Sequence, residues 1–95
     1  MQGISMTELY ERIMYSHEVE FIYDNATYVL QPIENDEKAW LIIDCLNTSK
    51  RICQHEIPIS GNIPEPVIDA VLSEKCFHGK SFMDIEQKIT VTVIY

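Results

Sequence analysis

The chain has 95 residues, of which 46% are hydrophobic, and a formal net charge of −8 at pH 7. This length fits a single domain, residues 1–95, and the composition is that of a folded globular protein and not of a disordered one. The longest apolar stretch, residues 39–43, is far shorter than the roughly 20 residues that cross a bilayer, so we expect no membrane-spanning segment.

The negative charge is concentrated in the first half of the chain. Residues 1–44 hold nine acidic and two basic side chains, whereas residues 45–95 hold six acidic and five basic ones. Nucleic acid binding needs a basic stripe, and Lys50-Arg51 is the only adjacent basic pair. An acidic field repels nucleic acid and attracts basic proteins. We therefore expect no direct contact with nucleic acid, and a basic protein as the partner.

Two features indicate a cytoplasmic protein. Residues 1–8 contain neither the basic region nor the apolar run of a secretion signal. The cysteines Cys45, Cys53 and Cys76 are an odd number that cannot complete a set of disulfides. Free cysteines fit a reducing compartment better than an oxidising one.

The first predicted element is a helix over about residues 6–16, where apolar side chains recur at helical spacing. Ser5 and Glu8 form the S-x-x-E pattern of a capping box, which places the start of this helix. Helical spacing on one side of the segment indicates that its apolar face lies against a sheet.

A strand hairpin follows the helix. Period-two alternation predicts strands over residues 18–24 and 27–31, and Asp24-Asn25-Ala26 supplies the residues of a tight turn between them. A two-residue loop there would set Tyr23 opposite Tyr28 and Phe21 opposite Leu30.

Two more strands are predicted before the second helix. Pro32 cannot donate a hydrogen bond to a neighbouring strand, so it marks a strand end or an edge position. Residues 38–45 predict a third strand, in which Trp40 has aliphatic neighbours on both faces, as in a central strand. Residues 51–57 predict a weaker fourth strand, because their alternation is poor.

The last third of the chain predicts two helices and a final strand. An apolar stripe at helical spacing covers residues 67–72, and Gly79 is the predicted end of that helix. Ser81, followed three residues later by an aspartate, is a helix N-cap and predicts a short helix over about residues 82–88. Alternation over residues 89–95 predicts a strand that runs to the last residue.

The element order is therefore α-β-β-β-(β)-α-α-β, which separates the helices from an antiparallel meander. This order predicts an α+β fold with a four- to five-stranded antiparallel sheet and helices packed on it. The terminal strand is expected to pair with the first or the third strand. An uncharged strand edge can also pair with a second copy, so a homodimer through this edge stands beside the monomer as an alternative.

Two Cys-x-His pairs supply the ligand types of a zinc site. They are Cys53 with His55 and Cys76 with His78, and Cys45 would lie near Cys53 across a hairpin. However, the C-x-H spacing departs from that of known structural zinc sites, and cysteine is commonly a small buried hydrophobe. We therefore expect isolated residues and no cofactor. The alternative is a small metal- or thiol-dependent protein that uses these side chains.

No catalytic residue is predicted. Gly79-Lys80-Ser81 looks like the end of a phosphate-binding loop, but the position of that motif's first glycine is occupied by Glu74. A cysteine or serine nucleophile needs a base and an oxyanion donor, and the sequence has neither a nucleophile elbow nor a Cys-His signature. We expect that the protein is not an enzyme.

Several short patterns resemble a group of short uncharacterised bacterial proteins that begin with a helix and a hairpin. The patterns are Phe21-x-Tyr23, Tyr28-x-Leu30, Trp40-x-Ile42, Gly79-Lys80-Ser81-Phe82-x-x-Ile85 and Ile89-x-Val91. The resemblance covers most of the chain and implies a bacterial protein and its fold, but no site residues. In size and charge the chain is also similar to bacterial immunity proteins and phage-encoded inhibitors.

The functional prediction is a non-enzymatic protein-interaction module, immunity-like or inhibitor-like, that docks a basic partner. Several of the acidic residues in the first half have local roles in a helix start, a turn or a strand end. The remaining acids form the candidate docking patch, namely Glu11, Glu18, Glu20 and Asp24.

Overall fold

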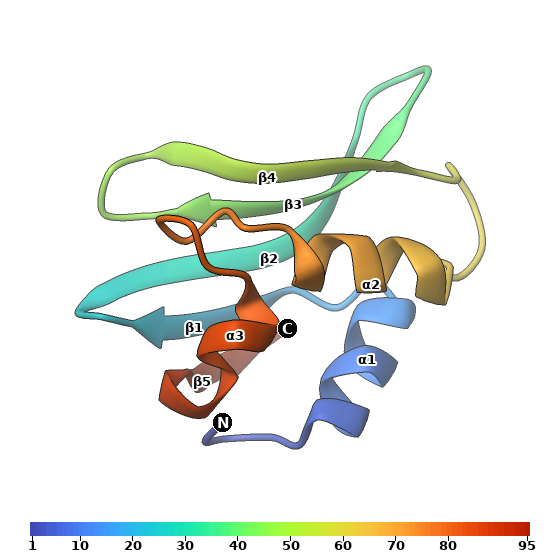
Figure 1. Ribbon diagram of the computed structural model, residues 1–95. Coiled ribbons are helices and arrows are strands. Elements are labelled where there is room, and N and C mark those ends of the chain that lie inside the picture. Colours follow the sequence, from blue (N-terminus) through green and yellow to red (C-terminus); the bar gives the residue numbers. More distant parts are fainter.

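Five antiparallel strands form one sheet in the order β4-β3-β2-β1-β5 in a computed structural model that describes all 95 residues (Figure 1). In chain order the elements are α1 (Met6–Met14), β1 (Val19–Tyr23), β2 (Ala26–Glu34), β3 (Ala39–Cys45), β4 (Lys50–Ile57), α2 (Glu65–Ser73), α3 (Phe82–Ile85), the 3₁₀ turn η1 (Glu86–Lys88) and β5 (Thr90–Ile94). The predicted α+β class and element order are confirmed, and the terminal strand lies beside β1. No helix has the length and apolarity needed to span a membrane.

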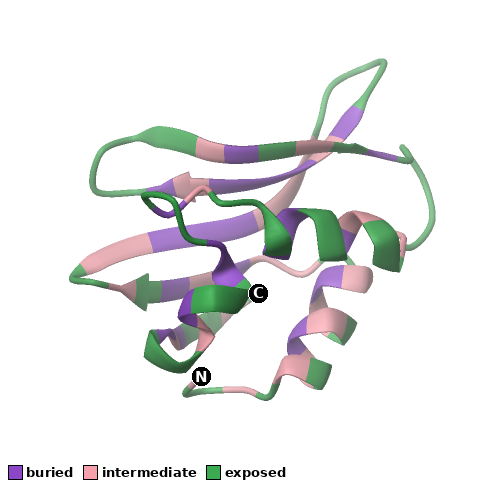
Figure 2. Ribbon diagram, in the orientation of Figure 1, coloured by how far each residue is buried: buried purple, intermediate pink, exposed green.

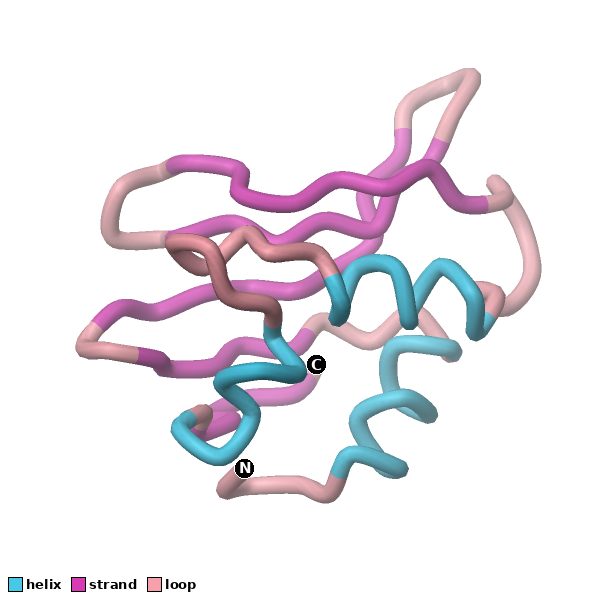
Figure 3. Tube along the Cα trace, viewed as in Figure 1, coloured by secondary structure: helices cyan, strands magenta, loops and turns pink.

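All helices lie on one face of the sheet, and the opposite face carries none (Figures 1 and 3). One cluster of 21 buried residues fills the space between the helices and the sheet. Figure 2 shows that buried segments run along the middle strands and recur on the helices. At its centre the Phe21 ring stacks on Tyr28, with ring centroids 5.4 Å apart, and meets the edge of Phe82 at 5.3 Å. The apolar stripes of the helices are thus buried on a single side of the sheet.

Both predicted helix N-caps are confirmed, but only Ser81 and Asp84 form the full capping box, because the Glu8 carboxylate does not bond back to Ser5. The Ser5 hydroxyl accepts a hydrogen bond from the backbone N–H of Glu8, at 3.1 Å. The Ser81 hydroxyl accepts one from the N–H of Asp84, also at 3.1 Å, and the Asp84 carboxylate accepts in return from the N–H of Ser81 at 2.9 Å. These bonds satisfy N–H groups that have no partner within the helix.

The β1–β2 hairpin has the expected two-residue loop, but the loop lies one residue earlier in the chain than predicted. Its loop consists of Asp24 and Asn25, whose φ angles of 50° and 63° are those of a two-residue turn with positive φ at both positions. Phe21 therefore pairs with Tyr28, and the predicted pairing with Leu30 is wrong. The aromatic stack in the core follows from this register.

Pro32 does not end β2, which continues to Glu34. On one side Pro32 pairs with Leu41 of β3. On the other side Pro32 has no partner, because β1 begins at Val19 and Val19 pairs with Leu30. Pro32 thus occupies an edge position within a longer strand, where a missing N–H breaks no sheet hydrogen bond.

Gly79 does not end the second helix. Helix α2 ends at Ser73, and the prediction for Gly79 is wrong. His78 and Gly79, with φ of 53° and 86°, form the corner of a tight turn in which Phe77 and Lys80 exchange two backbone hydrogen bonds of 2.8 and 3.2 Å. A glycine with positive φ suits such a turn as well as a helix end.

The N-terminal residues cover the outer edge of β5. The Gln2 N–H donates to the carbonyl of Ile89 at 2.9 Å, and the Val91 N–H donates to the carbonyl of Gln2 at 2.8 Å. Gly3 continues this contact with φ of +101°, and a Cβ at that position would lie 2.5 Å from the carbonyl oxygen of Val91. Half of the edge that we considered for a homodimer therefore already has a partner within the chain.

Replacing Gly3 with alanine should detach this segment. The matched control is Gly61→Ala, since Gly61 also has positive φ (+88°) but no atom within 4 Å of the added Cβ. Left-handed backbone costs each variant about 1–2 kcal/mol. Gly3→Ala should lose about 1 kcal/mol more for each broken hydrogen bond. Urea denaturation measures the difference, and hydrogen exchange should show faster exchange of the Val91 N–H in that variant alone. Equal destabilisation with an unchanged Val91 N–H would contradict this account.

Candidate functional site

The uncovered face of the sheet has an apolar interior. Alternation and strand register place on this face the side chains of Ile22, Val29, Ile33, Trp40, Ile42 and Val93. Ile42 is fully buried and Val29 is 4% exposed, although neither belongs to the core beneath the helices. Because no helix lies there, neighbouring side chains of the same face must cover them. Ile22 and Val93, by contrast, remain 40% and 38% exposed.

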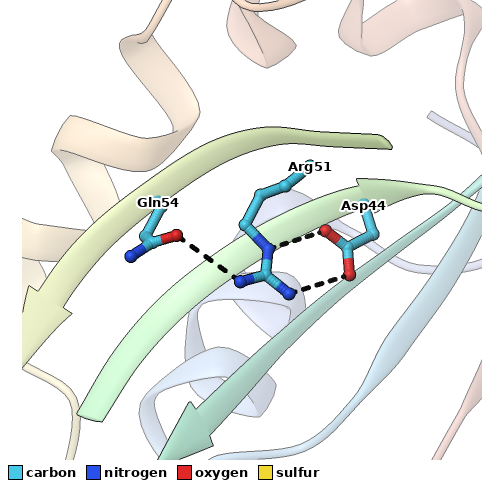
Figure 4. Close-up of polar contacts among 3 residues, drawn as sticks. All are labelled: Asp44, Arg51 and Gln54. Carbon is cyan, nitrogen blue, oxygen red and sulfur yellow. Dashed lines mark hydrogen bonds and ion pairs between the residues drawn. The ribbon is translucent and has the colours of Figure 1, made fainter. Parts of the chain in front are cut away.

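An ion-pair network covers the β3–β4 part of this face. The Arg51 guanidinium donates to both carboxylate oxygens of Asp44, at 2.9 and 3.4 Å, and to the Gln54 side-chain oxygen at 3.5 Å. Figure 4 shows the three side chains lying together over β3 and β4. The bidentate pair offsets one negative charge with one positive charge. This end of the face is therefore close to neutral.

The four acids of the predicted docking patch are not in one place. Glu18 and Glu20 alternate with the buried Val19 and therefore both face the open side of the sheet. Asp24 lies in the turn beyond the other end of β1. Glu11 is exposed on α1, in the helical layer.

Glu18 and Glu20 share their surroundings with the end of β5. The negative charge of Glu20 raises the pKa of Tyr95, and the charge of Glu18 adds to the effect. Val93 is paired with Glu20 across the two strands. We call Glu18, Glu20, Ile22, Val93 and Tyr95 the β1–β5 patch.

A second group of polar side chains lies at the opposite edge of the sheet, where β4 meets the segment after α2. Cys53 and His55 are two residues apart on β4, so their side chains share a face, here the one toward the helices. The thiol of Cys53, the imidazole of His55 and the carboxylate of Glu74 offer ligand atoms within 4.8 Å of one another. His55 Nε2 lies 2.8 Å from Glu74 Oε1.

Cys76 joins this group through Cys53. Hydrogen bonding with Cys76, and then burial, raises the pKa of the Cys53 thiol. The same hydrogen bond lowers the pKa of Cys76, so that Cys76 loses its proton first. Only the thiolate form is a strong nucleophile and metal ligand. Cys76 is also the only partly exposed cysteine of the chain.

The structure divides the five predicted Cys and His ligands. It brings Cys53 and His55 together beside Glu74, sets Cys76 next to Cys53 alone, and places the other two elsewhere. Cys45 pairs with Tyr28 and Lys50 across the strands, and His78 is exposed at the corner of its turn.

Glu74 is a member of the group that the sequence did not indicate. The sequence contains two Cys-x-His pairs, whereas in space Cys53 and His55 meet Glu74, and Cys76 adjoins Cys53. The only sequence signal for Glu74 was that it precedes Cys76 by two residues, the same spacing as between Cys53 and His55. A glutamate near a helix end is too common for that spacing to single it out.

Comparison of the chain with known protein families, with curated protein sequences and with solved structures finds no match.

The difference between the three thiols predicts their reactivity. In chelator-treated native protein, one cysteine should react rapidly with Ellman's reagent, because Cys76 is partly exposed and its pKa is lowered. Cys45 and Cys53, at 7% and 3% exposure, should react only after unfolding. Cys76→Ser should abolish the rapid phase, and Cys45→Ser should leave it intact. A rapid phase that survives in Cys76→Ser would refute the assignment.

Proposed function

We propose that the protein is a non-enzymatic interaction protein of the bacterial cytoplasm whose β1–β5 patch binds a basic protein. One observation carries this proposal: the open face of the sheet presents exposed aliphatic side chains beside two carboxylates that have no cationic partner. Neither Glu18 nor Glu20 takes part in any ion pair of the chain. A partner can supply the missing positive charge.

The composition of the patch favours lysine or arginine as the group that it binds. These side chains have a long aliphatic stem and a charged end. Ile22 and Val93 offer apolar contact for the stem, while Glu18 and Glu20 attract the charge. Tyr95 is 65% exposed and adds an aromatic ring, on which a cation can rest.

The charge of the whole chain supports a protein as the partner. With a net charge of −8 the molecule repels phosphate backbones, which dominate the affinity of nucleic-acid binding. The same charge accelerates the approach of a basic protein, and salt screens this effect. The proposed contact should therefore weaken as the ionic strength rises.

A charge reversal within the patch tests this proposal. We expect an arginine-rich hexapeptide, added to isotope-labelled protein at low salt, to shift the NMR signals of Glu20, Ile22 and Val93. The double variant Glu18→Lys/Glu20→Lys should abolish these shifts. The matched control is Glu11→Lys/Asp36→Lys, which changes the net charge equally at two exposed acids outside the patch and should retain them.

A photocrosslinker at residue 93 extends the test to the natural partner. In cells it should capture a basic protein, and capture should fail in the Glu18→Lys/Glu20→Lys background. The same crosslinker at residue 11 should not capture that protein. Peptide shifts spread evenly over all exposed acids, or capture that does not depend on the two glutamates, would remove the patch from consideration. Because all of these side chains lie at the surface, the variants should keep their stability within about 0.5 kcal/mol.

A further inference from the structure

We propose that Cys53, His55, Glu74 and Cys76 form a binding site for a zinc-class divalent metal ion. This site goes beyond the proposed partner surface. It lies at the β4 edge of the sheet, whereas the β1–β5 patch lies at the β5 edge, on the other side of the two strands β3 and β2. The two proposals can therefore fail independently.

The positions of three ligand atoms carry the argument. Tetrahedral zinc binds sulfur at about 2.3 Å and nitrogen or oxygen at about 2.0–2.2 Å, which sets its ligand atoms roughly 3.3–3.8 Å apart. The ligand atoms of Cys53, His55 and Glu74 already lie within 4.8 Å of one another. Metal binding thus needs movements of about 1 Å, within the range of small side-chain rotations.

The fourth position of a tetrahedral site has a candidate in Cys76, whose thiol interacts with that of Cys53 but lies outside the cluster of three ligand atoms. It follows Glu74 by two residues, so that one short segment after α2 supplies two ligands and β4 supplies the other two. Zinc sites commonly use two such pairs of nearby residues from separate elements, although with other spacings. The geometry here is set by the strand and not by a known sequence motif.

The ligand types select the class of metal. Two thiolates, one imidazole and one carboxylate are borderline-soft ligands that suit Zn²⁺. Magnesium and calcium prefer sites made only of oxygen atoms. His55 and Glu74 have side chains 30% and 41% exposed, so an ion can reach the site from solvent.

A bound ion would cross-link the segment after α2 to the edge strand β4. Besides the apolar contacts below α2, the connection between these parts is the His55–Glu74 pair and the contact of the Cys53 thiol with the carbonyl of Val71, at 4.0 Å. An ion held by four ligands from both elements would bind the folded state and not the unfolded state, because the unfolded chain does not hold the ligands together. Such binding stabilises the fold.

The test uses the full chain without a histidine tag. Protein made in zinc-supplemented medium should contain one zinc per chain by elemental mass spectrometry. Chelator-treated protein titrated with Co²⁺ should develop the thiolate charge-transfer and visible bands of a tetrahedral thiolate site. Zinc should also raise the thermal midpoint. His55→Ala and Glu74→Gln each change one partly exposed side chain, and each should weaken zinc binding at least about tenfold, the lower bound for loss of a supporting residue.

Two variants serve as matched controls. His78→Ala removes the histidine of the other Cys-x-His pair, and Cys45→Ser removes a buried thiol outside the group, so both should keep the affinity of the wild type. Circular dichroism establishes that each variant is folded. The proposal fails if the wild type binds no stoichiometric zinc or cobalt, or if His55→Ala binds zinc as the wild type does. It also fails if protein isolated without reductant shows a Cys53–Cys76 disulfide in place of two free thiols.

Discussion

The burial of Phe21 fixes which face of the sheet each neighbouring side chain of β1 occupies. Its ring contacts Tyr28, Phe77 and Phe82, so that one side chain joins two strands to the segment between α2 and α3 and to α3 itself. Because side chains alternate along a strand, turning Phe21 toward the helices turns Glu20 and Ile22 away from them. A slip of one residue would reverse both sets. The acidic and aliphatic character of the open face is thus a consequence of where this ring is buried.

A chain of this size covers its sheet on one side only. The helices are short, with nine residues in each of α1 and α2, and all of them are used on one face. The other face must protect its apolar residues with neighbouring side chains, as Arg51, Asp44 and Gln54 do over β3 and β4. At the β5 end no such network exists, and there Ile22 and Val93 remain exposed. Because the helices cover only one face of the sheet, the open face keeps an exposed surface at β1 and β5.

Local sequence signals predicted the helices and strands, but they could not predict contacts between residues that are far apart in the sequence. The caps at Ser5 and Ser81 are properties of a few adjacent residues, and both were predicted correctly. The hairpin register depends on which two of the residues Asp24, Asn25 and Ala26 form the loop, which turn composition alone does not determine. Gly79 suits a helix end and a tight turn equally. Glu11 and Glu20 are close in sequence but lie in different layers, and Glu74 meets His55 only because α2 folds back over β4.

The occupied part of one sheet edge and the charges on the other favour a contact through the open face over one through an edge. The beginning of the outer edge of β5 is paired with residues near the N-terminus, where Gly3 permits an approach that any Cβ would block. The other edge strand, β4, carries exposed charged side chains at Lys50, Arg51 and Glu56, which oppose pairing with a further strand. An added strand would have to displace the N-terminal segment from β5 or remove water from the charged side chains of β4. Binding at the β1–β5 patch requires neither, because its exposed side chains project from the sheet and leave the backbone hydrogen bonds intact.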